Sequence, residues 1–194
     1  MQDNTLDFYN TNAAQYAADD LIANPKLSGF LAKCKTGGHI LEMGTGSGVD
    51  ARAIIDAGFQ LDATDGSAEL AAIASQLIGQ PVRQMMFDEL DAHETYDGIY
   101  ACAALTHAPR NQLGAIIQKI HAALKPGGVV WASFKVGGGE GTDDLGRFYN
   151  YLPLPDLLDI WQNNASWAQL TIDQWHGSAY DKKPTEWAAI VAVR

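Results

Sequence analysis

The chain has 194 residues, of which 47% are hydrophobic and 19% are charged, and 23 acidic against 13 basic side chains give it a net charge of −10. This length and composition are typical of one globular domain, so we expect residues 1–194 to form a single domain. The negative charge argues against nonspecific binding to nucleic acid or to an anionic membrane, because both require a cationic surface.

Targeting and cross-linking signals are weak in this sequence. Residues 1–4 lack the basic region and the following apolar run of a signal peptide, and no apolar run approaches the ~20 residues that span a bilayer. We therefore expect a cytoplasmic protein that does not bind membranes. The two cysteines, Cys34 and Cys102, lack CxxC spacing and a histidine-rich neighbourhood, so we expect neither a disulfide framework nor a metal site.

The N-terminal part of the chain is expected to be helical. Apolar residues between positions 5 and 20 are spaced like one face of a short helix, and Pro25 can open a second helix that runs to Leu31. We treat residues 1–36 as a helical segment at the edge of the domain. A turn at residues 35–38 then leads into the first strand.

A glycine-rich loop follows this first strand, which begins at Ile40. Gly44, Gly46 and Gly48 stand at alternate positions, ahead of a helix expected from Val49 to Ala57. Glycines at this spacing allow a tight turn and let a ligand approach the backbone, although a glycine loop alone is a generic sign of a nucleotide site. The dinucleotide-binding spacing G-x-G-x-x-G would require a further glycine at the position of Val49.

Carboxylates flank this loop. Glu42 precedes it and Asp50 follows it, and no lysine or arginine occurs between residues 40 and 51. A diphosphate would be repelled here, whereas a ligand with an ammonium or sulfonium group would be attracted. The next apolar run ends at Asp65, at about the 20-residue offset where an acid meets ribose hydroxyls in mononucleotide-binding βαβ units. These features together favour an adenosine ligand with a cationic tail over a dinucleotide.

The rest of the chain alternates between strand and helix signals. Such alternation predicts a doubly wound, mainly parallel sheet, in which ligands bind at the carboxyl edge of the strands. Ser67 can cap the helix that follows Asp65, and the glycine-rich segment Lys135–Gly146 is expected to be a mobile loop. We expect the later strands at residues 82–86, 96–102, 129–134, 170–175 and 187–193, and the later helices at residues 109–124 and 154–161.

The spacing Glu42-x-Gly44-x-Gly46-x-Gly48, followed by Asp65-Gly66-Ser67-x-x-Leu70, resembles the first two motifs of the class I S-adenosylmethionine-dependent methyltransferases. Further similar segments lie at residues 96–100, 105–107 and 124–128, within a resemblance that is close over roughly residues 8–135. Within this family, residues 132–135, 146–148 and 186–187 are similar to a small bacterial group of tellurite-resistance-related or small-molecule methyltransferases.

The family resemblance implies both an architecture and a cofactor. The expected fold is an α/β, Rossmann-like, doubly wound sheet of seven strands in the order 3-2-1-4-5-7-6, with the last strand antiparallel and helices on both faces. The expected cofactor is S-adenosyl-L-methionine, with Tyr9 or Tyr16 of the N-terminal segment touching its methionine end. The expected cofactor-binding residues are Tyr16, Glu42, Gly44, Thr45, Gly46, Gly48, Asp65, Gly66, Ser67, Met86, Phe87, Ala101 and Leu105.

The sequence departs from the family pattern after the third strand. Many members have an aspartate there that contacts the adenine amino group, whereas this chain has Met86, with Phe87 and Asp88 beside it. Either Asp88 substitutes for the missing acid, or the adenine ring lies between apolar side chains and takes backbone N–H groups. We favour the second alternative, because Met86 and Phe87 offer flat, polarisable surfaces.

Two residues are our candidates for the chemistry. His107 follows the fourth strand, and an imidazole that titrates near neutral pH can act as a general base if the acceptor must lose a proton. Arg147 can hold an anionic acceptor, because a guanidinium binds carboxylates through two donors. The alternatives are a histidine fixed by backbone hydrogen bonds, and a surface ion pair of Arg147 with Asp143 or the adjacent Asp144. Lys135 and Trp187 are weaker candidates.

Three classes of function are compatible with these observations. The first is a methyltransferase that acts on a small molecule and works as a monomer or homodimer. The second is a regulatory protein that binds S-adenosylmethionine or its demethylated product without turnover, which the absence of an acid at Met86 leaves open. The third is a nucleotide-dependent oxidoreductase, which Val49 and the carboxylates beside the glycine loop disfavour.

Overall fold

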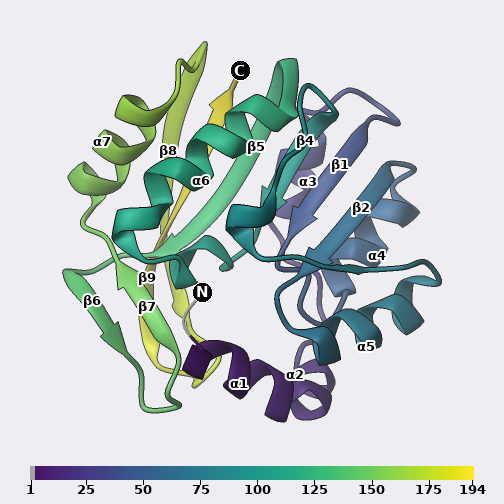
Figure 1. The fold of residues 1–194 in the computed structure, drawn as a ribbon, viewed down its shortest axis with the longest axis vertical. Helices are drawn as coiled ribbons and strands as arrows, with labels where there is room; N and C mark the ends of the chain where they lie inside the picture. The colour runs from purple at the N-terminus through teal and green to yellow at the C-terminus, as the bar shows by residue number, and fades with distance from the viewer. Residues whose placement is uncertain (1–2) are drawn as a thin grey trace.

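A computed structural model describes residues 3–194 as a central sheet with helices on both of its faces (Figure 1). The expectation about a signal peptide rests in part on residues 1–2, which lie outside the described residues. Within residues 3–194, no helix is long and apolar enough to cross a membrane.

The sheet has seven strands in the order β3-β2-β1-β4-β5-β9-β8. The first five run parallel to one another, and β9 is antiparallel to both of its neighbours, β5 and β8. Because β6 and β7 form a separate ribbon, this order is the predicted 3-2-1-4-5-7-6 with its antiparallel last strand. The strands are β1 His39–Met43, β2 Gln60–Asp65, β3 Arg83–Gln84, β4 Tyr96–Ala101, β5 Leu124–Lys135, β8 Gln169–Ser178 and β9 Pro184–Val193.

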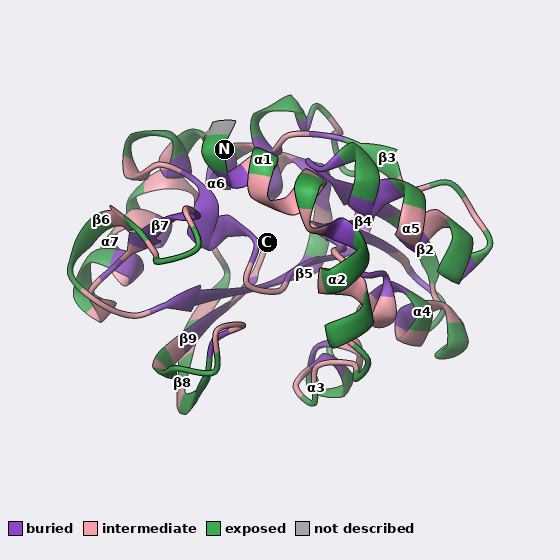
Figure 2. Ribbon diagram, turned by 90° about the horizontal axis from the view of Figure 1, so that it is seen from below, coloured by how far each residue is buried: buried purple, intermediate pink, exposed green. Residues whose placement is uncertain are grey.

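Two apolar clusters hold the helices against the sheet. One contains Leu113 of α6 and Trp161 of α7, and the other contains Phe30 of α3 and Ile54 of α4, so the two faces are covered by different helices. Buried residues accordingly concentrate in the strands, while the outer sides of the helices are exposed (Figure 2). The helices are α1 Asp3–Thr11, α2 Ala13–Asp19, α3 Leu27–Leu31, α4 Val49–Asp56, α5 Ala68–Ile78, α6 Arg110–Ala123 and α7 Leu154–Asn164.

Local signals predicted several element boundaries correctly. Helix α5 begins after Ser67, whose Oγ accepts the N–H of Leu70 at 3.2 Å, which is the expected capping hydrogen bond. Helix α6 follows its N-cap Pro109 and ends at Ala123, because Leu124 is already extended and begins β5. Proline is common at the start of a helix, because the backbone N–H that it lacks would have no acceptor within the helix there.

Other expectations were wrong. The N-terminal segment forms two helices, α1 and α2, because the chain leaves helical geometry at Asn12. The glycine-rich segment predicted as a loop contains β6 Gly139–Thr142, which pairs with β7 Phe148–Tyr151. Its glycines give no alternating apolar pattern, so sequence periodicity could not reveal this strand. Strand β3 is shorter than expected, and β5, β8 and β9 are longer.

Candidate active site

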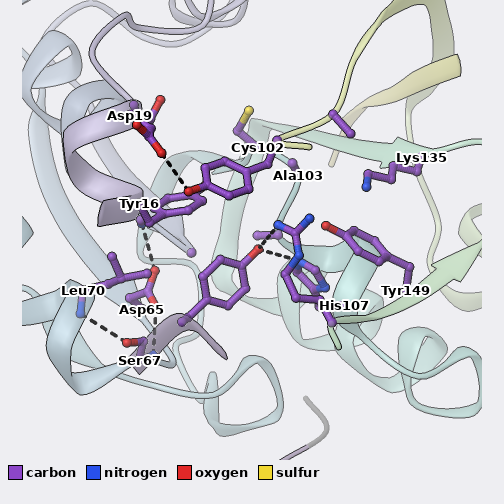
Figure 3. Close-up of a pocket in the computed structure, with 18 of the residues that line it drawn as sticks. Tyr16, Asp19, Asp65, Ser67, Leu70, Cys102, Ala103, His107, Lys135 and Tyr149 are labelled. Carbon is purple, nitrogen blue, oxygen red and sulfur yellow. Dashed lines mark hydrogen bonds between the residues drawn. The ribbon is translucent and has the colours of Figure 1, made fainter. Parts of the chain in front are cut away.

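A cavity of about 560 Å³ opens at the carboxyl edge of the central sheet. Figure 1 shows α1 and α2 lying below the ends of β1 and β2, and Figure 3 shows side chains from several elements converging on the cavity. Most of the lining comes from α1 and α2, the segments after α2, β1, β2 and β4, the end of β5, the start of β7, and the turn between β8 and β9.

The glycine loop after β1 forms one wall of the cavity. Gly44, Gly46 and Gly48 have φ values of +78°, +57° and +89°, which L-residues rarely adopt. A Cβ on Gly44 would lie 2.5 Å from the Cβ of Ala104, and one on Gly48 would lie 3.0 Å from Ala74. These glycines are therefore required both by the backbone conformation and by the close packing around the loop.

Asp65, the last residue of β2, lies beside this loop and lines the cavity. Its Oδ2 accepts the N–H of Gly46 at 2.9 Å, and its Oδ1 accepts the N–H of Ser67 at 2.8 Å. Burial raises the pKa of Asp65 to about 6, although the two backbone donors oppose this rise. Each carboxylate oxygen can accept more than one hydrogen bond, so Asp65 fixes the loop and keeps acceptor capacity for a ligand.

The structure corrects the expected role of Glu42. This side chain is 2% exposed, does not line the cavity, and accepts a hydrogen bond from Oγ1 of Thr45. Burial raises the pKa of Glu42 to about 8, so its carboxyl group is protonated at neutral pH and attracts a cationic ligand weakly.

Three other acids give the loop side of the cavity its negative character. Asp19 and Asp20, at the end of α2, line the cavity together with Asp65. Asp20 is held against the glycine loop by Ser47, whose Oγ donates to its Oδ2 at 2.6 Å. Sequence analysis missed this pair, because only the folded chain brings α2 against the loop. The signal that could have found it is the presence of two consecutive acids at the end of the N-terminal helical segment.

Tyr9 and Tyr16 both line the cavity, and the contact of either with the methionine end of the cofactor stays a prediction. Their rings meet edge to face with centroids 5.3 Å apart. Tyr16 covers Gly46, where an added Cβ would lie 3.4 Å from Cε1 of the tyrosine. Ser67 holds α1 in place by donating from Oγ to Oδ1 of Asn10 at 2.6 Å. The N-terminal helices therefore form a wall of the cavity.

His107 lies in a short helical turn after β4 and is 3% exposed. Its Nδ1 lies 2.6 Å from the carbonyl oxygen of Phe148, and its Nε2 lies 3.0 Å from Oη of Tyr9. A carbonyl oxygen only accepts hydrogen bonds, so Nδ1 carries the proton and Nε2 accepts from the tyrosine. Burial lowers the pKa of His107 to about 4, which is below the neutral range expected from the sequence.

Arg147 is 1% exposed, immediately precedes β7 and lines the cavity. Its Nε and Nη2 donate to Oδ2 of Asp143 at 3.0 and 2.7 Å, and its Nη1 lies 3.4 Å from Oη of Tyr9. The rings of Phe8 and Tyr149 lie 5.0 and 5.3 Å from the guanidinium carbon. Pairing with Asp143 occurs as considered from the sequence, but the pair is buried instead of lying on the surface.

Lys135, the last residue of β5, also lines the cavity and is 6% exposed. Its Nζ lies 3.7 Å from the ring centroid of Tyr149 and 6.0 Å from that of Trp187, its partner residue in β9. Burial, together with the nearby charge of Arg147, lowers the pKa of Lys135 to about 8.

The predicted cofactor residues divide into two groups. Met86 is half-buried and donates its N–H to Oε2 of Glu89, while Asp88 is exposed, and neither lines the cavity. Ala101 and Leu105 are fully buried in the apolar core, and Ala103 and Ala104 reach the cavity instead. The predicted residues that line the cavity are Tyr16, Gly44, Gly46, Asp65, Gly66, Ser67 and Phe87, whereas Glu42, Thr45, Gly48, Met86, Ala101 and Leu105 do not.

A model of the methyltransferase domain family matches residues 11–135. The chain belongs to this methyltransferase family. No curated protein matches it. The methyltransferase match contains the glycine loop, Asp65, His107 and Lys135, whereas Tyr9, Arg147 and Tyr149 lie outside it.

Solved structures share this methyltransferase fold. A Burkholderia thailandensis 1,6-didemethyltoxoflavin-N1-methyltransferase, with bound 1,6-didemethyltoxoflavin and S-adenosylhomocysteine, is 21% identical with a TM-score of 0.76, over 98% of this chain and 87% of that one. A Haemonchus contortus phosphoethanolamine N-methyltransferase 2, in complex with S-adenosyl-L-methionine, is 17% identical with a TM-score of 0.75, over 100% and 60%. A Methanosarcina mazei SAM-dependent methyltransferase is 16% identical with a TM-score of 0.72, over 90% and 99%.

Proposed function

We propose that the chain is an S-adenosylmethionine-dependent methyltransferase that methylates a small molecule within the cavity. The observation that carries this proposal is the position of Asp65, which lines the cavity at the end of β2 and accepts the N–H of Gly46. An acid in this place suits ribose hydroxyls, and the tight glycine loop lets a ligand approach the backbone. Membership of the methyltransferase family implies the same cofactor.

The residues on the loop side of the cavity fit this cofactor. Asp65 would accept hydrogen bonds from the ribose, and Phe87 with Leu70 would provide the apolar surface for the adenine ring. Asp19 and Asp20 would attract the cationic methionine end, with Tyr16 beside the glycine loop. Met86 and Asp88 have no part in this assignment, because both lie outside the cavity lining.

The protein's contribution to the reaction is mainly positioning. When bound, S-adenosylmethionine supplies an activated methyl group on a sulfonium. Holding two reactants in line can contribute on the order of 7–11 kcal/mol to the acceleration, so the site needs no nucleophile of its own. Where the acceptor has to lose a proton, Tyr9 and His107 both line the cavity, and Nε2 of His107 already accepts a hydrogen bond from the Tyr9 hydroxyl.

A small acceptor suits the size of the cavity, about 560 Å³, which the cofactor must share. Two of the similar solved structures are named for small acceptors, 1,6-didemethyltoxoflavin and phosphoethanolamine. The likeness to the tellurite-resistance-related group stays a prediction. It rests on segments that contribute Lys135, Arg147 and Trp187 to the cavity lining.

Titration calorimetry with S-adenosylmethionine, S-adenosylhomocysteine and NAD tests the proposal. We expect the two methionine-derived ligands to bind and to stabilise the fold by about 2.7 kcal/mol at a hundred times their dissociation constants, while NAD does neither. Binding of NAD alone would reassign the chain as an oxidoreductase. Incubation with labelled S-adenosylmethionine and a panel of oxyanions, thiols, amines and carboxylates then distinguishes an enzyme from a protein that binds the cofactor without turnover.

A further inference from the structure

The charged side chains that line the cavity are divided between its two sides. Figure 3 shows Asp19 and Asp65 on one side, and Lys135 with Tyr149 and His107 on the other. The acids surround the glycine loop, which we have assigned to the cofactor. The basic and aromatic side is therefore the side that remains for the methyl acceptor.

Arg147 does not supply an available charge on this side. Its Nε and Nη2 are both directed to Oδ2 of Asp143, and the side chain of Asp143 is only 10% exposed. A buried guanidinium that donates twice to one carboxylate oxygen is already neutralised. Arg147 therefore organises β7 and the Tyr9 hydroxyl, instead of waiting for an anionic ligand.

Lys135 is in a different situation. Among residues 3–194, its Nζ has no hydrogen-bond acceptor and no carboxylate within ion-pair distance, although the residue is 6% exposed. The face of Tyr149, 3.7 Å away, offers a cation–π contact on one side. A protonated amine needs hydrogen-bond acceptors, and the cavity onto which Lys135 opens is where an acceptor can reach it (Figure 3).

We propose that the methyl acceptor carries an oxyanion, such as a carboxylate or a phosphate, and that this group binds to the ammonium of Lys135. The inference rests on the proposed function, because it assigns the acceptor side of the same cavity. Tyr149 and Trp187 flank the ammonium with aromatic surface, which suits an acceptor whose anionic group is attached to an apolar or flat body. Burial lowers the pKa of Lys135 to about 8, so most of the side chain is still charged at pH 7 and able to bind an anion.

The experiment measures anion binding to the protein saturated with S-adenosylhomocysteine. The probes are benzoate, phenyl phosphate and inorganic phosphate, with benzamide as the neutral counterpart of benzoate. Titration calorimetry gives affinity, and the 13Cε NMR signal of Lys135, assigned by its loss in Lys135→Met, gives the pKa of the amine. We expect at least one oxyanion to bind and to raise that pKa by one unit or more, because an ion pair favours the charged form, whereas benzamide leaves it unchanged.

Three variants test whether the oxyanion binds to Lys135 itself. Lys135→Met should weaken oxyanion binding at least tenfold, Lys135→Arg should retain part of it, and Lys33→Met, which removes an exposed charge outside the cavity, should leave it within about twofold. Binding of S-adenosylhomocysteine to Lys135→Met should match the wild type and shows that the variant is folded.

Failure of the wild type to bind S-adenosylhomocysteine would count against the proposed function itself. The inference about Lys135 is overturned separately, if S-adenosylhomocysteine binds but no oxyanion raises the pKa of Lys135. Equal oxyanion affinity in the wild type and Lys135→Met would also overturn it, because the anion would then bind elsewhere.

Discussion

The hydroxyl of Tyr9 lies 3.0 Å from Nε2 of His107, although 98 residues separate the two in the chain. The other ring nitrogen, Nδ1, faces the carbonyl oxygen of Phe148 at 2.6 Å. The two contacts together fix the tautomer of His107 and connect α1, the segment after β4 and β7 at one point of the cavity. Because Arg147 also reaches Oη of Tyr9, at 3.4 Å, the tyrosine joins both residues that sequence analysis proposed for the chemistry.

We predict that His107 stays neutral, with its proton on Nδ1, between pH 5.5 and 8. Burial holds its pKa at about 4, so the imidazole gains a proton only in acid. Long-range 1H–15N NMR, with the signal assigned by its loss in His107→Gln, reports both the tautomer and the titration. Tyr9→Phe removes the hydrogen bond that the neutral ring accepts and should raise the pKa of His107. A wild-type titration near pH 6.5 would restore the simpler view of His107 as a neutral-pH base.

The lowered pKa of His107 also determines how the stability of the fold depends on pH. The folded protein disfavours the charged imidazole, so the contribution of His107 to stability is present above the unfolded pKa of about 6.5 and is lost as pH falls through 4. Relative to His107→Gln, the wild type should therefore lose free energy of unfolding between pH 6.5 and 4. Urea denaturation at a series of pH values measures this difference, and a constant difference would contradict it.

Two ion pairs on consecutive acids provide a matched comparison. Asp143 pairs with Arg147, whose side chain is 1% exposed, whereas Asp144 pairs with Lys183, whose side chain is 60% exposed. Arg147→Met leaves Asp143 nearly buried without its partner and should lower the free energy of unfolding by about 3–5 kcal/mol. Lys183→Met should leave it close to the wild-type value, because an exposed pair is screened by solvent.

Thermal or urea denaturation of the two variants, under the same buffer and salt, tests this contrast. The double variant Arg147→Met with Asp143→Asn should recover part of the loss, since it removes the uncompensated carboxylate. Similar losses of unfolding free energy in Arg147→Met and Lys183→Met would show that the buried pair stabilises the fold no more than the exposed pair.

Glu42→Gln should remove a loss of folding stability that the wild type undergoes as pH rises. Burial raises the pKa of Glu42 to about 8, so the folded protein favours the protonated side chain. The resulting stability is complete below the unfolded pKa of about 4.3 and is lost as pH rises through 8. Between pH 5 and 8.5 the variant should become more stable than the wild type, by on the order of 2–4 kcal/mol at the upper end. Urea denaturation of both proteins, with Glu69→Gln as a control for loss of an exposed carboxylate, checks the trend; an advantage that does not grow with pH would contradict it.

Features set by local sequence were predictable. The strand order implied by the resemblance, the cap at Ser67 and the placement of Asp65 beside the glycine loop all depend on residues close together in the chain or on a recurrent motif. The protonated state of Glu42 could not be predicted, because it follows from complete burial, which depends on the packing of distant elements.

The acceptor side of the cavity was harder to predict for the same reason. It depends on contacts such as Tyr9 with His107, which no local pattern encodes. Its β6–β7 ribbon is built from a glycine-rich segment that has no strand periodicity, and that ribbon brings Arg147 beside the cavity and buries it. Lys135 and Arg147 were both named as candidates, but only their contacts show that Arg147 is neutralised and Lys135 is not.

The assignment of Asp65 to the cofactor leads to the last prediction. Asp65→Asn removes the charge and one acceptor oxygen from the cavity while keeping a side chain of the same shape. Losing hydrogen bonds to a charged acceptor costs roughly 1.5–3 kcal/mol, so the dissociation constant of S-adenosylhomocysteine should rise by about ten- to a hundredfold. The matched control is Asp88→Asn, an exposed acid outside the cavity, which should bind as tightly as the wild type. Titration calorimetry of S-adenosylhomocysteine binding to both variants decides whether Asp65 or Asp88 contacts the cofactor. Weakened binding in Asp88→Asn with normal binding in Asp65→Asn would move the cofactor contact to the segment after β3 and revive Asp88 as the substitute for the missing acid.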